Sequence, residues 1–227
     1  MTPQTRRHLH TALKLLAVCL LAASCASSRP GHVRSHRGGS GYVKDNHPAI
    51  WISDHPRVAY FREHYRRTPT VETALSQGRA YLPAIGRVFE KHRLPQELAY
   101  LPMLESMFEN RANSGHARGM WQFTRQTAEH IGLRVGAMVD ERLNWRKSTE
   151  AAATYLDQLG EQFNYDWALA LAAYNGGPGY MQDAMRQQRR RDFFSLRLRK
   201  ETEEYVPRFI AMLQVAKEKY AHLMAAR

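Results

Sequence analysis

A chain of 227 residues with 44% apolar residues is long enough for one globular domain with an appendage. Its net charge of +12 would attract polyanions in general. The Lys and Arg residues are nevertheless scattered and form no nucleic-acid reader motif, so we do not expect a nucleic-acid partner. The two cysteines, Cys19 and Cys25, both lie in the first segment, and the histidines lack a zinc-like spacing. We therefore expect neither a metal nor another cofactor.

The first 24 residues have the pattern of a secretory signal peptide. Basic residues precede and enter an apolar run at 13–23, which is shorter than the roughly 20 apolar residues that span a bilayer. The segment Leu-Ala-Ala-Ser-Cys at 21–25 resembles a bacterial lipobox, which implies that Cys25 is lipidated. The residue after Cys25 is Ala26 and not Asp, which favours anchoring at the periplasmic face of the outer membrane. A soluble periplasmic or secreted protein cut nearby is the alternative.

The segment 25–48 is rich in Ser, Gly, Arg and His and holds almost no large apolar residue. Such a segment cannot bury enough apolar surface to offset the entropy of ordering, so we predict a flexible tether. From residue 50 onward the apolar spacing becomes helical. We divide this part into an N-terminal helical extension, 49–69, and a main domain, 70–222.

The first predicted helix follows Asp54, an N-cap candidate, with Pro56 in its first turn. A longer helix is predicted over 70–92, although Pro83 should kink it because proline lacks a backbone donor. Its apolar face is predicted to be buried. The buried positions expected in these two helices are Val58, Phe61, Tyr65, Leu75, Leu82, Ile85 and Phe89.

Later helices are predicted from caps and apolar periodicity, and no segment shows a convincing strand pattern. Thr124 is expected to cap a short helix that Gly132 ends. The remaining predicted helices cover 148–163, 168–174, 180–188 and 201 to the C-terminus. The sequence therefore predicts an all-α fold.

One carboxylate stands out by its surroundings. Glu105 ends an apolar run, and an Asn, Ser and Gly loop connects it to an aromatic segment at 121–123. Burial disfavours the charged form of a carboxyl, so Glu105 should keep its proton near neutral pH, as a glycosidase acid must. The nearest second carboxylate, Glu109, is expected to lie beyond the helix end and exposed. A mechanism with a single acid fits this pattern best.

Four blocks carry a family resemblance, and they occur in a fixed order. They are Leu-Pro-Gln-Glu-Leu-Ala-Tyr-Leu-Pro-Met-Leu-Glu-Ser at 94–106, Gly-Met-Trp-Gln-Phe at 119–123, Ala-Tyr-Asn-Gly-Gly-Pro-Gly at 173–179, and Glu-Thr with Tyr-Val-Pro at 201–207. Together they resemble the family 23 lytic transglycosylases over about residues 70–220, and most closely the family's membrane-bound branch. The resemblance implies a lysozyme-like all-α (goose-type, SLT) domain that acts on peptidoglycan glycan strands.

The same resemblance implies a reaction without water. Glu105 would protonate the oxygen between N-acetylmuramic acid and N-acetylglucosamine. It would then take a proton from the sugar's own 6-hydroxyl, which closes on C1 as a 1,6-anhydro product. A goose-type muramidase that uses water, and a non-catalytic envelope scaffold that binds glycan, are the competing functions. The sequence does not indicate which proteins it binds.

The substrate-binding residues follow from the matched blocks. Ser114 and Gln122 would bond acetamido and hydroxyl groups, although Gln122 could instead brace the backbone. Of Trp121 and Phe123, one would stack on a sugar and the other would pack in the core. The predicted substrate-binding residues are Ser114, Gln122, Phe123, Tyr174, Asn175 and Tyr205.

Tyr174 and Asn175 would form the opposite wall, although Tyr174 could be a core aromatic, and Tyr205 would lie near the acid. Two departures from the family pattern accompany this assignment. The loop after Ser114 is one residue short, and Tyr180 replaces the usual arginine after Pro-Gly.

Overall fold

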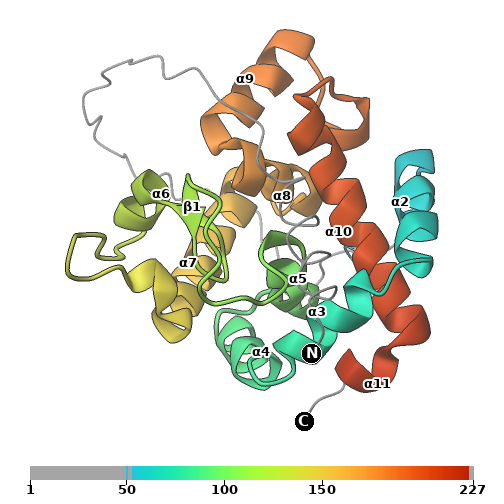
Figure 1. Cartoon of the computed structure of the whole chain (residues 1–227). Helices are drawn as coiled ribbons and strands as arrows, with labels where there is room; N and C mark the ends of the chain where they lie inside the picture. Colours follow the sequence, from blue (N-terminus) through green and yellow to red (C-terminus); the bar gives the residue numbers. More distant parts are fainter. Residues whose placement is uncertain (1–49, 51–52, 225–227) are drawn as a thin grey trace. The chain divides into compact units, whose positions relative to one another are not determined.

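The structure is a computed structural model that describes residue 50 and residues 53–224. These residues lie within one compact unit of the chain, Lys44–Arg227. Most of them are helical, which confirms the all-α class (Figure 1). The predicted signal peptide, Cys25 and the predicted tether lie outside the described residues. None of the helices in 53–224 is long and apolar enough to cross a membrane.

Short and medium-length helices, joined by turns, make up most of residues 53–224. The α-helices are α2 (Pro56–Arg66), α3 (Thr70–Gly78), α4 (Leu82–Lys91), α5 (Leu101–Glu105), α6 (Arg125–His130), α7 (Trp145–Gln162), α8 (Trp167–Gly176), α9 (Pro178–Gln188), α10 (Lys200–Lys219) and α11 (Ala221–Met224). The 3-10 helices are η1 (Gln96–Tyr100), η2 (Glu141–Leu143) and η3 (Phe193–Ser195), and the strands are β1 (Ala117–Arg118) and β2 (Phe123–Thr124).

Helix α10 is the main packing surface of the domain. It contacts α2, α8, α3 and α5, and it lies between α2 and α8 in Figure 1. Along α10 the buried residues recur at helical spacing, including Phe209, Met212 and Val215. Helix α8, by contrast, is apolar on all sides and is enclosed by α7, α9 and α10. These contacts fix the ends of α5, α8 and α10 relative to one another, which matters for the site described below.

The predicted helix starts are partly correct. Thr124 caps α6, since its hydroxyl accepts from the backbone N–H of Thr127. Asp166 caps α8 in the same way, by accepting from the N–H of Leu169. The prediction for α2 was wrong by one residue, because the ring of His55, and not Asp54, accepts from the first turn.

The predicted helix over 70–92 is two helices in the structure. Helix α3 ends at Gly78, and α4 begins at Leu82 with Pro83 in its first turn. At a first turn the missing N–H of proline costs no helical hydrogen bond, so Pro83 starts a helix and does not kink one. The predicted apolar face is nonetheless confirmed, because Leu75, Leu82, Ile85 and Phe89 are all buried.

A small antiparallel sheet was not predicted. Ala117 pairs with Thr124 and Arg118 with Phe123, so that the residues 119–122 form the connection. Gly119 sits in this connection at φ +82, and a Cβ there would meet the carbonyl oxygen of Arg142 at 2.0 Å. Strands of two residues are too short to show an alternating pattern, which explains why the sequence did not reveal them.

Candidate active site

Glu105 is the last residue of α5, a helix of five residues with Pro102 in its first turn. The chain leaves the helix immediately afterwards, because Met107 and Phe108 adopt left-handed conformations. Ser106 ties this helix end to the segment 119–123, since its hydroxyl donates to the carbonyl oxygen of Met120 at 2.7 Å. The position of Glu105 is therefore fixed by a helix on one side and by a buried hydrogen bond on the other.

The Glu105 carboxyl is half-buried, and the hydroxyl of Tyr205 donates a hydrogen bond to its Oε1. Burial raises the pKa of Glu105 to about 7; the hydrogen bond from Tyr205 lowers it, and the charge of Glu201 raises it further. Within residues 53–224, no Lys, Arg or His forms an ion pair with Glu105. A carboxyl in this state can hold a proton near neutral pH and donate it to a substrate.

Tyr174 lies close enough for the charge of Glu105 to raise its pKa, but its hydroxyl bonds a backbone carbonyl and not the acid. It donates to the carbonyl oxygen of Trp121 at 2.7 Å. Its ring packs against Tyr155 and Phe123, with centroids 5.7 and 5.9 Å away. Burial, followed by the Glu105 charge, raises the pKa of Tyr174 well above its ordinary value. Tyr174 is thus a protonated donor that holds the segment 119–123 against α8.

Asn175 is fixed by the start of α10. Its Oδ1 accepts from the hydroxyl of Thr202 at 2.9 Å, and its Nδ2 donates to Glu201 Oε1 at 3.4 Å. Glu201 stands four residues before Tyr205, so both lie on one face of α10. Our interpretation of the sequence gave Glu201 no role of its own. The four-residue spacing to Tyr205 was the signal that could have identified it.

Gln122 and the two aromatic residues beside it point inward. The Gln122 amide donates to the carbonyl oxygen of Gly119 at 2.8 Å, which is the bracing role considered as an alternative. Trp121 is fully buried, stacks on Phe89, and donates to the Thr149 hydroxyl at 3.0 Å. Phe123 is 2% exposed. In this structure both aromatic rings therefore belong to the core, whereas the sequence predicted that one would face a sugar.

Ser114 lies in an exposed turn and not beside Glu105. Its hydroxyl accepts from the backbone N–H of Ala117 at 3.2 Å, and no described hydrogen bond links it to the acid. His116 in the same turn is also exposed. Glu109 is exposed as expected, because α5 has already ended. The structure thus brings Tyr174, Asn175 and Tyr205 toward Glu105 and leaves Ser114 at the edge of a turn.

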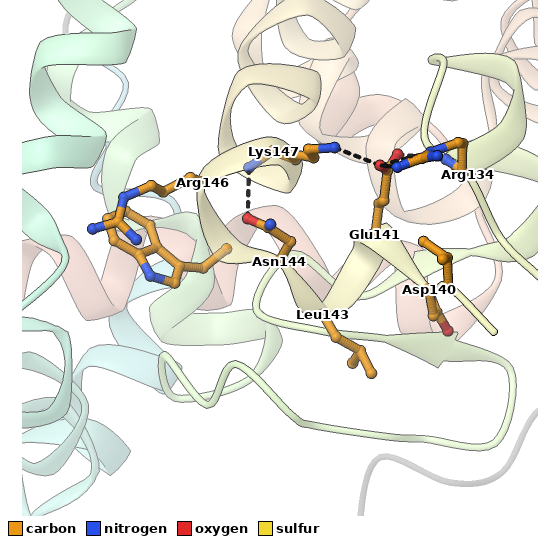
Figure 2. Close-up of a pocket in the computed structure, with 9 residues that line it drawn as sticks. Arg134, Asp140, Glu141, Leu143, Asn144, Arg146 and Lys147 are labelled. Carbon is orange, nitrogen blue, oxygen red and sulfur yellow. Dashed lines mark hydrogen bonds and ion pairs between the residues drawn. The ribbon is translucent and has the colours of Figure 1, made fainter.

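A cluster of carboxylates and basic side chains, away from Glu105, supports the segment 119–123. Glu141 is 7% exposed and accepts from Arg134 Nη2 at 2.7 Å and from Lys147 Nζ at 2.6 Å (Figure 2). These hydrogen bonds lower the pKa of Glu141 to about 2. The neighbouring Arg142 binds Asp140 and donates to the carbonyl oxygen of Phe123 at 3.2 Å. The cluster therefore braces strand β2.

The same cluster borders an open surface pocket of about 520 Å³ (Figure 2). Neither Glu105 nor any of the residues joined to it lines this pocket. Its two carboxylates, Asp140 and Glu141, form ion pairs with arginine side chains. These pairs keep them ionised, so they are poorly suited to proton transfer. The pocket is therefore not the candidate active site.

Glu105, a carboxyl with a pKa of about 7 that a tyrosine holds at a junction of helices, gives this all-α domain the arrangement of a lysozyme-like domain. Comparison with known proteins agrees with this class. Residues 87–196 match the transglycosylase SLT domain. The chain is 33% identical over 172 residues, or 73% of its length, to the membrane-bound lytic murein transglycosylase D of Escherichia coli strain K12 and of strain O6:H1.

It is also 39% identical over 100 residues to a putative tributyltin chloride resistance protein of Alteromonas sp. strain M-1, covering 44% of this chain and 48% of that one. The chain spans 38% of the length of the E. coli relatives. The SLT-domain match and the identity to the E. coli relatives confirm the resemblance to the family 23 lytic transglycosylases seen in the four sequence blocks.

Proposed function

We propose that this domain is a peptidoglycan lytic transglycosylase in which Glu105 is the single general acid and base. In the first step the protonated carboxyl of Glu105 donates its proton to the oxygen between N-acetylmuramic acid and N-acetylglucosamine. The bond from that oxygen to the muramoyl C1 breaks, and the 2-acetamido group supports the cationic centre. In the second step the Glu105 carboxylate takes the proton of the 6-hydroxyl, whose oxygen closes on C1. The products are a free N-acetylglucosamine end and a 1,6-anhydro-muramoyl end.

The observation that carries this proposal is the state of Glu105. Its pKa of about 7 lets it be an acid before bond cleavage and a base after it, within the same pH range. Tyr205 supports the ionised state, because its hydroxyl donates to the carboxylate and keeps it oriented. Since burial and the Glu105 charge raise the pKa of Tyr205 well above its ordinary value, this hydroxyl stays protonated throughout.

Roles for the surrounding residues are part of the same proposal. Asn175, held by Thr202 and Glu201, offers an amide to the substrate at the α8 end. Tyr174 belongs to the same wall as Asn175, Gln122 braces the turn at 119–122, and Phe123 supports both from the core. Ser114 would reach the substrate from the exposed turn before β1.

The mass of the products tests this reaction. Purified sacculi digested by the full chain should yield muropeptides with 1,6-anhydro ends, which are one water lighter than hydrolysis products. The Glu105→Gln variant should yield none, whereas the matched Glu109→Gln variant should behave like the wild type. Digestion unchanged by Glu105→Gln would remove the catalytic assignment and favour a glycan-binding scaffold.

Hydrolysis is the second candidate function, and one observation favours it. Glu201 is a carboxylate whose charge reaches Glu105, and it is exposed to solvent. In an inverting glycosidase, a second carboxylate at such a place would activate water. Products with reducing muramoyl ends, lost in Glu201→Gln, would establish hydrolysis. Anhydro products from both the wild type and Glu201→Gln would exclude that role for Glu201.

We also propose that the domain acts at the periplasmic face of the outer membrane, tethered by a lipid on Cys25. The pattern at 21–25 and the membrane-bound name of the E. coli relatives support this placement. Metabolic labelling with a fatty acid should mark the wild type but not Cys25→Ser. A labelled Cys25→Ser variant, or an unlabelled wild type in the soluble fraction, would contradict the anchor.

A further inference from the structure

One exposed arginine near the candidate active site is held by a hydrogen bond and by stacking on an aromatic ring. Arg199 immediately precedes α10 and is exposed. Its guanidinium lies over the ring of Tyr180, with 4.1 Å from Cζ to the centroid. Its Nη2 donates to the carbonyl oxygen of Gly176 at 2.9 Å, and its backbone N–H donates to the Tyr180 hydroxyl at 2.7 Å. Two contacts thus orient the guanidinium, and the backbone hydrogen bond fixes Arg199 beside Tyr180.

The position of Arg199 connects it to the Glu105 site. Gly176, its backbone partner, directly follows Asn175, which we place in the substrate wall. Glu201, two residues after Arg199, binds Asn175 and influences the pKa of Glu105. Arg199 is therefore at the rim of the same site, on the side formed by α8, α9 and α10. Tyr180, whose ring lies under the Arg199 guanidinium, is also a position where the chain departs from the family pattern.

The charge of Arg199 is not used within the described part of the chain. Among residues 53–224, no carboxylate forms an ion pair with its guanidinium, although Glu201 lies nearby and is bound to Asn175. A guanidinium has five N–H donors in a planar fork that matches a carboxylate, and one of its nitrogens contacts Gly176. A pre-oriented, unpaired arginine at a site rim is suited to bind an anionic group of the substrate.

The proposed substrate carries such a group at a suitable place. The bond that Glu105 would cleave starts at C1 of a muramoyl residue, and that residue bears a lactyl branch at C3. On intact strands the branch carries a peptide with free carboxylates, and on strands without peptide it ends in its own carboxylate. We propose that Arg199, supported by Tyr180, binds a carboxylate of this lactyl branch and thereby selects muramoyl strands. This inference rests on the proposed function, because it takes peptidoglycan as the substrate.

Binding to a catalytically inactive chain tests the inference separately from the reaction. We would measure dissociation constants in the Glu105→Gln background, with and without Arg199→Gln, for three ligands. These are glycan strands with peptides, the same strands after an amidase has removed the peptides, and chitin oligosaccharides, which lack the lactyl branch. The matched control is Arg191→Gln, which removes another exposed arginine from the loop after α9.

We expect Arg199→Gln to weaken binding about tenfold for strands that carry the partner carboxylate, and to leave chitin binding unchanged. A loss confined to peptide-bearing strands assigns the carboxylate to the peptide, and a loss confined to stripped strands assigns it to the lactyl group. A loss on both shows that either source is accepted. Unchanged binding of both strands, an equal loss on chitin, or an equal loss in Arg191→Gln would overturn the inference.

A second variant keeps the test valid if Arg199→Gln disturbs the turn at Gly176. Arg199→Lys retains the charge and a donor but loses the planar fork, so it should show a smaller loss with the same ligand selectivity. A loss for all three ligands in Arg199→Lys would indicate a purely structural role and overturn the inference. If the wild type proved hydrolytic in the product-mass experiment, the proposed reaction would fail, while this binding result would stand by itself.

Discussion

Glu105 is a half-buried carboxyl and Glu141 is a buried one, and their pKa values are shifted in opposite directions. Glu141 accepts hydrogen bonds from Arg134 and Lys147, which lower its pKa to about 2. Glu105 has Tyr205 as its hydrogen-bond partner, and burial raises its pKa to about 7. The comparison shows that the partner decides what burial does to a carboxyl. A basic side chain keeps a carboxylate ionised, whereas a neutral hydroxyl lets a buried carboxyl keep its proton.

The difference in pKa gives Glu141 a structural role and Glu105 a chemical one. Because its pKa is about 2, Glu141 is ionised at neutral pH, so it can hold the segment 134–147 but has no proton to donate there. Glu105 is near the middle of its titration at neutral pH, where a general acid and base is most effective. Changes to Glu105 and Glu141 should therefore affect activity and stability in opposite ways.

The largest expected effect is on catalysis. Glu105→Gln keeps the shape and an acceptor for Tyr205 but has no proton to transfer, so kcat should fall by about 10²–10⁴-fold. Glu141→Gln, in variants shown to be folded by circular dichroism, should retain most of the activity. Release of soluble muropeptides from sacculi measures both. Comparable losses in the two variants would break the distinction between them.

The next effect concerns the pH profile. Glu105 must be protonated to start the reaction, so kcat/KM should fall as the pH rises through about 7. Tyr205→Phe removes a hydrogen bond that lowers the pKa of Glu105, so the alkaline limb should move to higher pH. Activity should also fall about tenfold, because the carboxylate loses its orienting donor. An alkaline limb that moved to lower pH in Tyr205→Phe would contradict this assignment.

A third pair of measurements concerns stability. Because the pKa of Glu105 is raised from 4.5 to about 7 on folding, the folded protein holds a proton that the unfolded chain releases between these values. The wild type should therefore lose up to about 3 kcal/mol of unfolding free energy as the pH rises through this window. Glu105→Gln removes this loss, so its stability relative to the wild type should increase with pH.

Glu141→Gln should show the opposite trend in the same urea-unfolding series. The folded pKa of Glu141 is lowered from 4.5 to about 2, so its contribution to stability is present above about pH 4.5 and disappears toward pH 2. The variant should be less stable than the wild type at neutral pH, and the gap should close as the pH falls. Parallel curves for the two variants would contradict the assigned protonation states.

The smallest expected effect comes from removing one cation of the Glu141 cluster. Lys147→Gln leaves the hydrogen bonds from Arg134 to Glu141 in place, and Lys147 itself is half-exposed. Exposed ion pairs contribute little, so the urea midpoint should fall slightly and the activity should not change. A loss of activity in Lys147→Gln would show that the cluster takes part in the reaction, and would remove the contrast with Glu105.

The sequence predicted local features well because their causes are local. The cap at Thr124 and the apolar face of α4 depend on residues a few positions apart. Glu105 stood out because its own apolar run implies burial. The split between α3 and α4 was missed because Pro83 reads the same at a first turn as inside a helix.

The parts that could not be predicted from periodicity depend on contacts between distant segments. Tyr205 meets Glu105 across 100 residues, and only the family resemblance indicated this. Trp121 and Phe123 read as a possible sugar-stacking pair, but α7 and α8 supply Thr149, Tyr155 and Tyr174 that enclose them. The pattern of a segment does not show which neighbours will cover it.

Direct titration of the Glu105 carboxyl tests the central claim most directly. The chain would be labelled with 13C at the glutamate side-chain carboxyl, and the Glu105 signal would be identified by its absence in Glu105→Gln. We predict that this signal titrates with a pKa of about 7 and that the Glu141 signal does not titrate above pH 4. A Glu105 signal that titrates near 4.5, like an ordinary glutamate, would contradict the claim.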